Sequence, residues 1–198
     1  MNHDRAQRST VLVLLLLLLF ATAPAALAGE KFTFHPDQKM DASPSPGKAL
    51  IYFVRSQSFG GAIKVKLFGD GDFIGVVHRK TFIPYECEPG KHEFVVVAEN
   101  AGFLEAEVEA GKIYYVLVAI HMGAMKARTH FETARAGSDA LESILENKAK
   151  LRGITTTAAG LEWVKKDRQK DKKKIDKYRA KGEEFETLRP ADGYAELQ

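Results

Sequence analysis

Short apolar segments separated by turn signals fill the middle of the chain, from Ala49 to about Thr133. Some of them, such as Leu50–Arg55 and Ile113–Ile120, are apolar on both faces, which is typical of strands that are covered on both sides. Others alternate apolar and polar residues, which is typical of strands with one wet face. Strands spaced about 8–12 residues apart favour a sandwich or barrel. The pattern therefore predicts a mainly β fold, a small antiparallel β-sandwich of about seven strands over residues 49–134.

The alternating segment Ile63–Phe68 shows how faces are assigned from this pattern. Its apolar residues, Ile63, Val65 and Leu67, are spaced two apart and should face the core. The lysines between them, Lys64 and Lys66, should then lie in water. Residues 29–48, which precede the sandwich and contain a Ser-Pro-Ser-Pro-Gly run, are predicted to be an extended leader.

The hydrophobic period changes from two to about 3.6 after the strands. Residues 138–152 carry an apolar stripe at Leu141, Ile144 and Leu145, which predicts a helix packed on the sandwich. A second, longer helix is predicted over residues 157–182, where Gly182 is a natural stop. Residues 183–198 are expected to form a tail.

The second predicted helix is strongly basic. Between Leu161 and Lys181 it has ten basic and four acidic residues, so its net charge is 10 − 4 = +6. Arg168 and Asp171 interrupt its apolar seam, which argues against a coiled coil. Such a helix is either a solvated, partly self-paired face or a surface that attracts a polyanion. The predicted polyanion contacts are Lys165, Lys166, Arg168, Lys170, Lys172, Lys173, Lys174 and Lys177.

Residues 1–28 have the three parts of a secretory signal peptide. Arg5 and Arg8 precede the leucine-rich run Val11–Phe20, and small residues then lead to an A-x-A end at Ala28. We therefore expect export, with the protein periplasmic or secreted after cleavage near Ala28. The alternative is an uncleaved segment that stays as an N-terminal anchor.

Cys87 is the chain's one cysteine, so a disulfide within the chain is not expected. It shares a strand face with Ile83 and Tyr85, which indicates a small buried residue. The alternative is a reactive thiol that works with His78 or His92 across the fold. Because the chain has no G-x-S-x-G or comparable catalytic motif, we expect a protein that is not an enzyme.

Neither a cofactor nor a metal is predicted, since the histidines lack the paired spacings of a structural zinc site. A monovalent copper site at His121, Met122 and Met125 is the alternative, because thioether and imidazole groups suit that ion. A calcium site at Glu105, Glu107 and Glu109 is another, although residues along one strand face are more often solvated.

Four segments carry a resemblance to a known family: Lys48–Arg55 (KALIYFVR), Val65–Gly71 (VKLFGDG), Glu88–His92 (EPGKH) and Gly111–Tyr115 (GKIYY). From about residue 48 to residue 134 the chain resembles the bacterial envelope family known as domain of unknown function 2846. Its Pro-Gly turn is similar to that of PEGA-type sandwich modules. The resemblance implies an exported, often lipid-anchored β-sandwich with no assigned activity. This chain has no cysteine at the predicted cleavage point, so it is expected to be free of lipid.

Together these features predict a non-enzymatic envelope module that interacts with an envelope protein or polymer. The alternative is a protein that binds a polyanion, either anionic lipid or wall polymer, through the basic helix. Polyanion binding through the basic helix would include peripheral contact with an anionic membrane surface. Nucleic acid is not expected as a partner because the chain is predicted to be exported.

Overall fold

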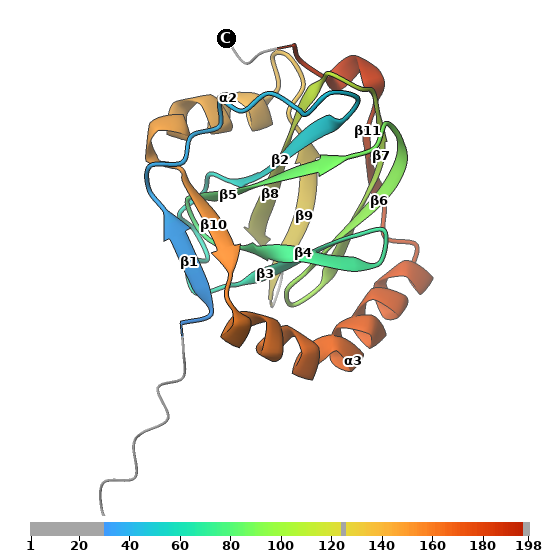
Figure 1. Ribbon diagram of the computed structural model, residues 1–198. Coiled ribbons are helices and arrows are strands. Elements are labelled where there is room, and N and C mark those ends of the chain that lie inside the picture. Colours follow the sequence, from blue (N-terminus) through green and yellow to red (C-terminus); the bar gives the residue numbers. More distant parts are fainter. Residues whose placement is uncertain (1–29, 124–125, 196–198) are drawn as a thin grey trace, which may run out of the picture.

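Two β-sheets pack face to face, and helices lie on their outer sides (Figure 1). The computed structural model describes residues 30–123 and 126–195. The predicted signal peptide, residues 1–28, lies outside the described residues. None of the described helices combines the length and the apolar composition that crossing a membrane requires.

One sheet has six strands and the other has five. In spatial order the first contains β1 (Phe32–His35), β10 (Arg152–Thr156), β5 (Thr81–Cys87), β2 (Ala49–Arg55), β8 (Ile113–Met122) and β9 (Ala127–Thr133). The second contains β11 (Phe185–Leu188), β7 (Ala101–Val108), β6 (Gly90–Val97), β3 (Val65–Gly69) and β4 (Asp72–Val77).

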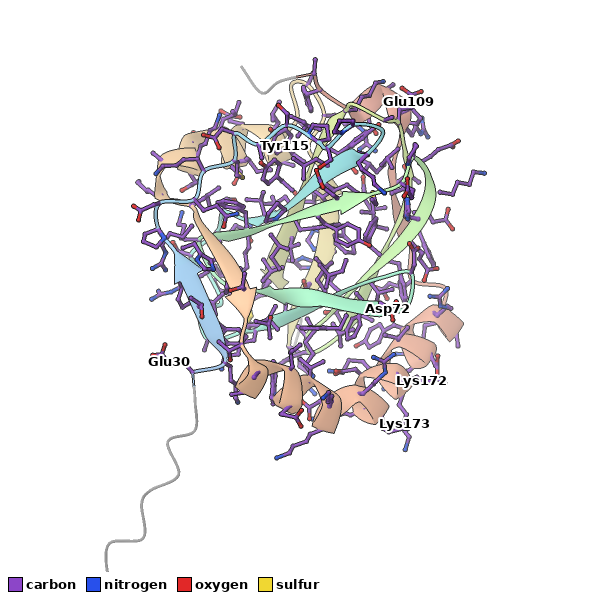
Figure 2. The ribbon with its side chains drawn as sticks, in the orientation of Figure 1. Glu30, Asp72, Glu109, Tyr115, Lys172 and Lys173 are labelled. Carbon is purple, nitrogen blue, oxygen red and sulfur yellow. The ribbon has the colours of Figure 1, made fainter. Side chains whose placement is uncertain are left out.

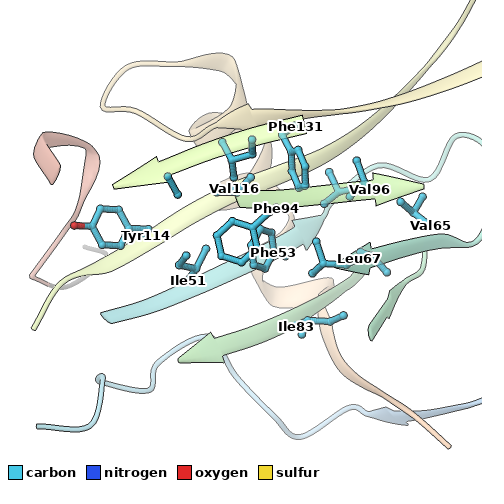
Figure 3. Packing of buried hydrophobic residues seen from close by; sticks show 14 of the residues in the cluster. Ile51, Phe53, Val65, Leu67, Ile83, Phe94, Val96, Tyr114, Val116 and Phe131 are labelled. Atoms are coloured by element: carbon cyan, nitrogen blue, oxygen red, sulfur yellow. The ribbon is translucent and has the colours of Figure 1, made fainter. Parts of the chain in front are cut away.

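The main core lies between the two sheets (Figure 3). Phe53 of β2 and Phe94 of β6 meet across the gap with ring centroids 4.9 Å apart. Val65 and Leu67 of β3 are fully buried in the same core, as their alternation predicted. Burial of this apolar area is the main favourable contribution to folding.

Helix α2 (Asp139–Asn147) covers the outer face of the six-stranded sheet, where Ile144 packs with Tyr52 and Tyr115. It begins after Ser138, whose hydroxyl accepts a hydrogen bond from the Leu141 amide, and a short 3-10 turn, η1 (Lys148–Lys150), follows it. Helix α3 (Ala158–Ala180) begins after Thr157 in the same way. A second 3-10 turn, η2 (Pro190–Asp192), follows β11.

The prediction of about seven strands was wrong, because the described residues form eleven. Eight of these, β2 to β9, lie in the segment where strands were expected. The other three are β1 in the predicted leader, β10 between the helices, and β11 in the predicted tail. These strands have only four or five residues each, too few for a clear alternation. They form because an existing sheet edge offers unpaired backbone groups.

The sandwich is also not purely antiparallel as predicted. β2 pairs with β8, β10 with β5, and β11 with β7 in parallel. Parallel neighbours need a long connection between them. Between β2 and β8 the long connection is made by strands that include β3, β4, β6 and β7 of the other sheet. Hydrophobic alternation does not reveal such an arrangement.

Arg55 at the end of β2 is fully buried and holds the following loop in place. Its guanidinium donates to the carbonyls of Phe59, Gly60 and Ile63 at 2.9, 2.7 and 2.6 Å. Burial, with a smaller contribution from nearby Arg79, lowers the pKa of Arg55 to about 10. The cation is therefore solvated by backbone oxygens in place of water.

Candidate functional site

Helix α3 lies across the outer face of the five-stranded sheet (Figure 1). Ile175 and Tyr178 pack on a small apolar cluster that includes Phe68, Val95 and Phe103. Nearer the start of the helix, Val164 is buried in the main core. Val164, Ile175 and Tyr178 of the apolar seam therefore form the docking face of α3, whereas Leu161 is exposed.

A buried ion pair joins α3 to the sheet. Nζ of Lys66 lies 2.6 Å from Oδ2 of Asp171 and 3.0 Å from Oδ2 of Asp167. Only 6% of the Lys66 side chain and 7% of the Asp171 side chain are exposed. The prediction that Lys66 lies in water was wrong, because α3 covers that face of β3. The same ammonium lies 4.5 Å from the ring centre of Trp163, a cation–π contact.

Two further cations fasten the C-terminal half of α3. Arg179 makes a bidentate pair with Glu93 of β6, at 2.7 and 2.9 Å, and its guanidinium lies 5.0 Å from the Phe103 ring centre. Lys174 donates to the backbone carbonyl of Ala98. Burial lowers the pKa of Lys174, and the neighbouring Asp171 charge partly opposes that shift.

The eight predicted polyanion contacts fall into three groups on α3. Lys174 is partly buried and faces the sheet, whereas the other seven are exposed. Lys165, Arg168 and Lys172 line a groove beside the helix. The remaining four, spaced i, i+4, i+7 and i+11, lie on the side of the helix opposite Val164. We call these four the outer stripe: Lys166, Lys170, Lys173 and Lys177.

The acidic residues of α3 are distributed differently from its lysines. Asp167 and Asp171 face the sheet and bind Lys66, and Glu162 pairs with Lys165 at 2.8 Å. Glu162 and Asp176 stay exposed beside the outer stripe, but its four lysines outnumber them. Figure 2 shows Lys172 and Lys173 on α3 at the lower edge of the molecule. Docking of the helix thus leaves its outward side with an excess of lysines over carboxylates.

The groove beside α3 has a volume of about 600 Å³ and is lined by residues of the helix and of β3 and β6. Phe68, Val95 and Ile175 form its apolar floor. Arg168 and Lys172 stand on its rim, so the groove joins an apolar surface to a cationic one.

A second groove, of about 630 Å³, runs along β6, β7 and β11, and its charge is mixed. His92 there binds Asp70 Oδ2 through Nδ1 at 2.7 Å and the Glu88 carbonyl through Nε2 at 2.8 Å. Burial disfavours the charged imidazole, but the two hydrogen bonds outweigh it and raise the pKa of His92. Glu105 and Glu107 on its wall are exposed, as expected of a solvated strand face.

Cys87 is buried, as predicted. Burial, together with the charges of Asp70 and Glu88, raises the pKa of the thiol to about 11. His92 is already bound by Asp70 and by the Glu88 carbonyl. Across the described ranges, no hydrogen bond joins Cys87 to His78 or His92.

The structure does not bring His121 and Met122 together as the alternative copper site would require. Met122 is 66% exposed and follows His121 on a strand, so the two side chains point to opposite faces. Met125 lies outside the described residues. His121 instead meets His130 of the neighbouring strand, with Nδ1 atoms 3.2 Å apart.

Sequence reasoning missed Lys66, Glu93 and Arg179 as residues that position the candidate surface. The one available signal was Asp171, a carboxylate at a seam position of the basic helix. A charge at such a position needs a partner, and here the partner comes from β3.

Residues 45–130 match the family described as Protein of unknown function (DUF2846). This match confirms the family resemblance over a segment that is less than half of the chain. It spans β2 to the middle of β9, so α3 and the outer stripe lie beyond it. No curated protein matches the chain. The likeness of this segment to PEGA-type modules stays a prediction.

Proposed function

We propose that this protein is an exported, non-enzymatic envelope module that binds phosphate-bearing polyanions through the outer stripe of α3. The positive charge of the outward side of α3 carries the proposal, since two of the helix's four carboxylates, Asp167 and Asp171, are turned to the sheet and bind Lys66. The phosphates belong to lipid headgroups or to wall polymer. Export rests on the signal peptide predicted over residues 1–28.

The way α3 is docked supports peripheral binding. Its apolar residues are already in contact with the sandwich, so few remain to enter a bilayer. The buried pair of Lys66 with Asp171 fixes which side of the helix faces outward. Binding is then mainly electrostatic and should weaken steeply with added salt.

Reversing three lysines of the outer stripe tests the proposal. Lys166, Lys173 and Lys177 lie farthest from the sheet, so Lys166→Glu/Lys173→Glu/Lys177→Glu should leave the fold intact. A lysine near an anionic surface contributes about 1 kcal/mol, so the triple variant should bind about a hundredfold more weakly. Cosedimentation with phosphatidylglycerol vesicles measures the lipid arm, and titration with polyphosphate measures the polymer arm.

The matched control is Lys39→Glu/Lys91→Glu/Lys150→Glu, which changes the net charge equally at exposed sites away from α3. It should retain most of the affinity. The proposal is supported if only the first variant loses binding to both the vesicles and polyphosphate. If it loses binding to one of them, that one identifies the source of the phosphate. Equal losses in the two variants, or unchanged binding in the first, would overturn it. Binding to an envelope protein that survives the first variant would favour the other predicted role.

A further inference from the structure

Two histidines meet on the outer face of the six-stranded sheet, at the end of β8 and β9. In the strand register His121 lies opposite Arg128 and His130 opposite Ala119, so both imidazoles stand on one face. Their Nδ1 atoms are 3.2 Å apart, with ring centroids 4.7 Å apart and planes inclined by 68°. The ring centroids are too close together for the two Nδ1 atoms to point straight at each other. The two rings therefore meet at an angle.

Glu132 fixes the state of one ring. Its Oε1 lies 2.7 Å from Nε2 of His130. A carboxylate only accepts hydrogen bonds, so Nε2 of His130 is the protonated nitrogen. In a neutral ring this leaves a lone pair on Nδ1, directed toward His121. A carboxylate behind a histidine is the arrangement that orients metal-binding imidazoles.

We propose that Nδ1 of His121 and Nδ1 of His130 together bind a divalent transition metal ion, with water completing its coordination. Metal–imidazole bonds of about 2.0–2.1 Å to nitrogens this far apart subtend about 100° at the metal, between square-planar and tetrahedral values. Among first-row divalent ions copper(II) should bind most tightly, since imidazole sites follow the Irving–Williams order.

The surroundings suit a solvent-exposed site with two protein ligands. In the part of the chain that the structure describes, no three His, Cys, Asp or Glu residues gather around one point. Arg128 brings a positive charge opposite His121, but its Nη1 lies 3.9 Å from Glu183 Oε1, which offsets part of that charge. The ligands are imidazoles on both strands, unlike the thioether set that the sequence suggested for monovalent copper.

Titration of the untagged protein with Cu²⁺ tests the site, with calorimetry for affinity and electron paramagnetic resonance for the ligands. We expect one bound Cu²⁺ with splitting from two nitrogens. His121→Ala and His130→Ala should each weaken binding by at least about tenfold and remove one nitrogen from the spectrum. Zn²⁺ should bind the same site more weakly.

His35→Ala is the matched control, because His35 bonds to Thr155 on another part of the same sheet. It should leave affinity and spectrum unchanged. Melting temperatures measured without metal show whether each variant is folded, and glutamine replaces alanine at the same position in any variant that is not. Unchanged Cu²⁺ binding in the folded His121→Ala and His130→Ala proteins would overturn the proposal, as would equal loss in His35→Ala.

Discussion

Nζ of Lys66 on β3 lies 2.6 Å from Oδ2 of Asp171 on α3, and both side chains are almost completely removed from water. Asp167 adds a second carboxylate at 3.0 Å. This pair fixes the rotation of α3 about its axis. The outer stripe faces outward because the opposite side of α3 is bound to the sheet through the buried pair of Asp171 with Lys66.

Breaking this pair should be costly. Asp171→Ala leaves the Lys66 ammonium buried with only Asp167, so the free energy of unfolding should fall by about 3–5 kcal/mol. Replacing both partners, as Lys66→Met/Asp171→Leu, should recover most of that loss, because two apolar groups need no solvation. Urea denaturation monitored by circular dichroism measures both.

The exposed Asp176 on the same helix is the control for the ion-pair experiment, and Asp176→Ala should change stability by no more than about 0.5 kcal/mol. An Asp171→Ala protein as stable as this control would show that the contact contributes nothing to docking.

Cys87 should react slowly in the folded protein. With a pKa of about 11, the thiol is almost entirely protonated at pH 8, and the thiolate is the reactive form. Reaction with a disulfide reagent at pH 8 should therefore be about a hundredfold slower than that of a free cysteine. Denaturant should restore the ordinary rate. A fast reaction without denaturant would mean that the thiol is neither buried nor protonated.

His92 and Asp70 should make stability depend on pH in opposite directions. The folded pKa of His92 is raised above 6.5, so its contribution is complete below 6.5 and disappears as pH rises through the folded pKa. Burial disfavours the Asp70 charge, but its hydrogen bond from His92 outweighs this and lowers the pKa below 3.8. The Asp70 contribution is present above 3.8 and disappears as pH falls through the folded pKa.

The titration of His92 can be followed by nuclear magnetic resonance of its ring protons. The midpoint should lie above 6.5 and should fall in Asp70→Asn, where the carboxylate is lost. A midpoint at or below 6.5 in the unaltered protein would contradict the hydrogen bond to Asp70.

Arg55 should be needed for the loop that follows β2. Arg55→Met keeps much of the side-chain volume but leaves the carbonyls of Phe59, Gly60 and Ile63 without their donor. The free energy of unfolding should fall by about 1–3 kcal/mol. In Arg55→Met, hydrogen exchange of the amides of residues 56–64 should be faster than in the unaltered protein, and the increase should be larger than that in β2. If exchange in the loop is unchanged, the guanidinium is not what holds it.

The spacing of apolar residues predicted those strands and helices that have long, regular patterns. The strands from β2 to β9 and the two helices follow from alternation, helical spacing and turn residues. The short strands β1, β10 and β11 could not be predicted this way, because their pairing depends on sheet edges formed by residues far away. Lys66 was misplaced for the same reason, since its burial depends on a helix a hundred positions later in the chain.

The candidate surface was predictable in composition but not in arrangement. Counting charges identified the basic helix, yet the burial of Asp167 and Asp171 against Lys66 appears only when the docking face is known. The meeting of His121 and His130 depends on strand register, which neither residue's immediate neighbours specify.

The pairing of β1 with β10 has a consequence for the order of folding. Phe32 lies opposite Thr156, so the first described strand cannot complete its pairing until nearly the whole domain has been synthesised. Contacts between such distant residues slow folding. A chain released progressively from its N-terminus would leave β1 unpaired until Thr156 has emerged, so this edge of the six-stranded sheet is completed late.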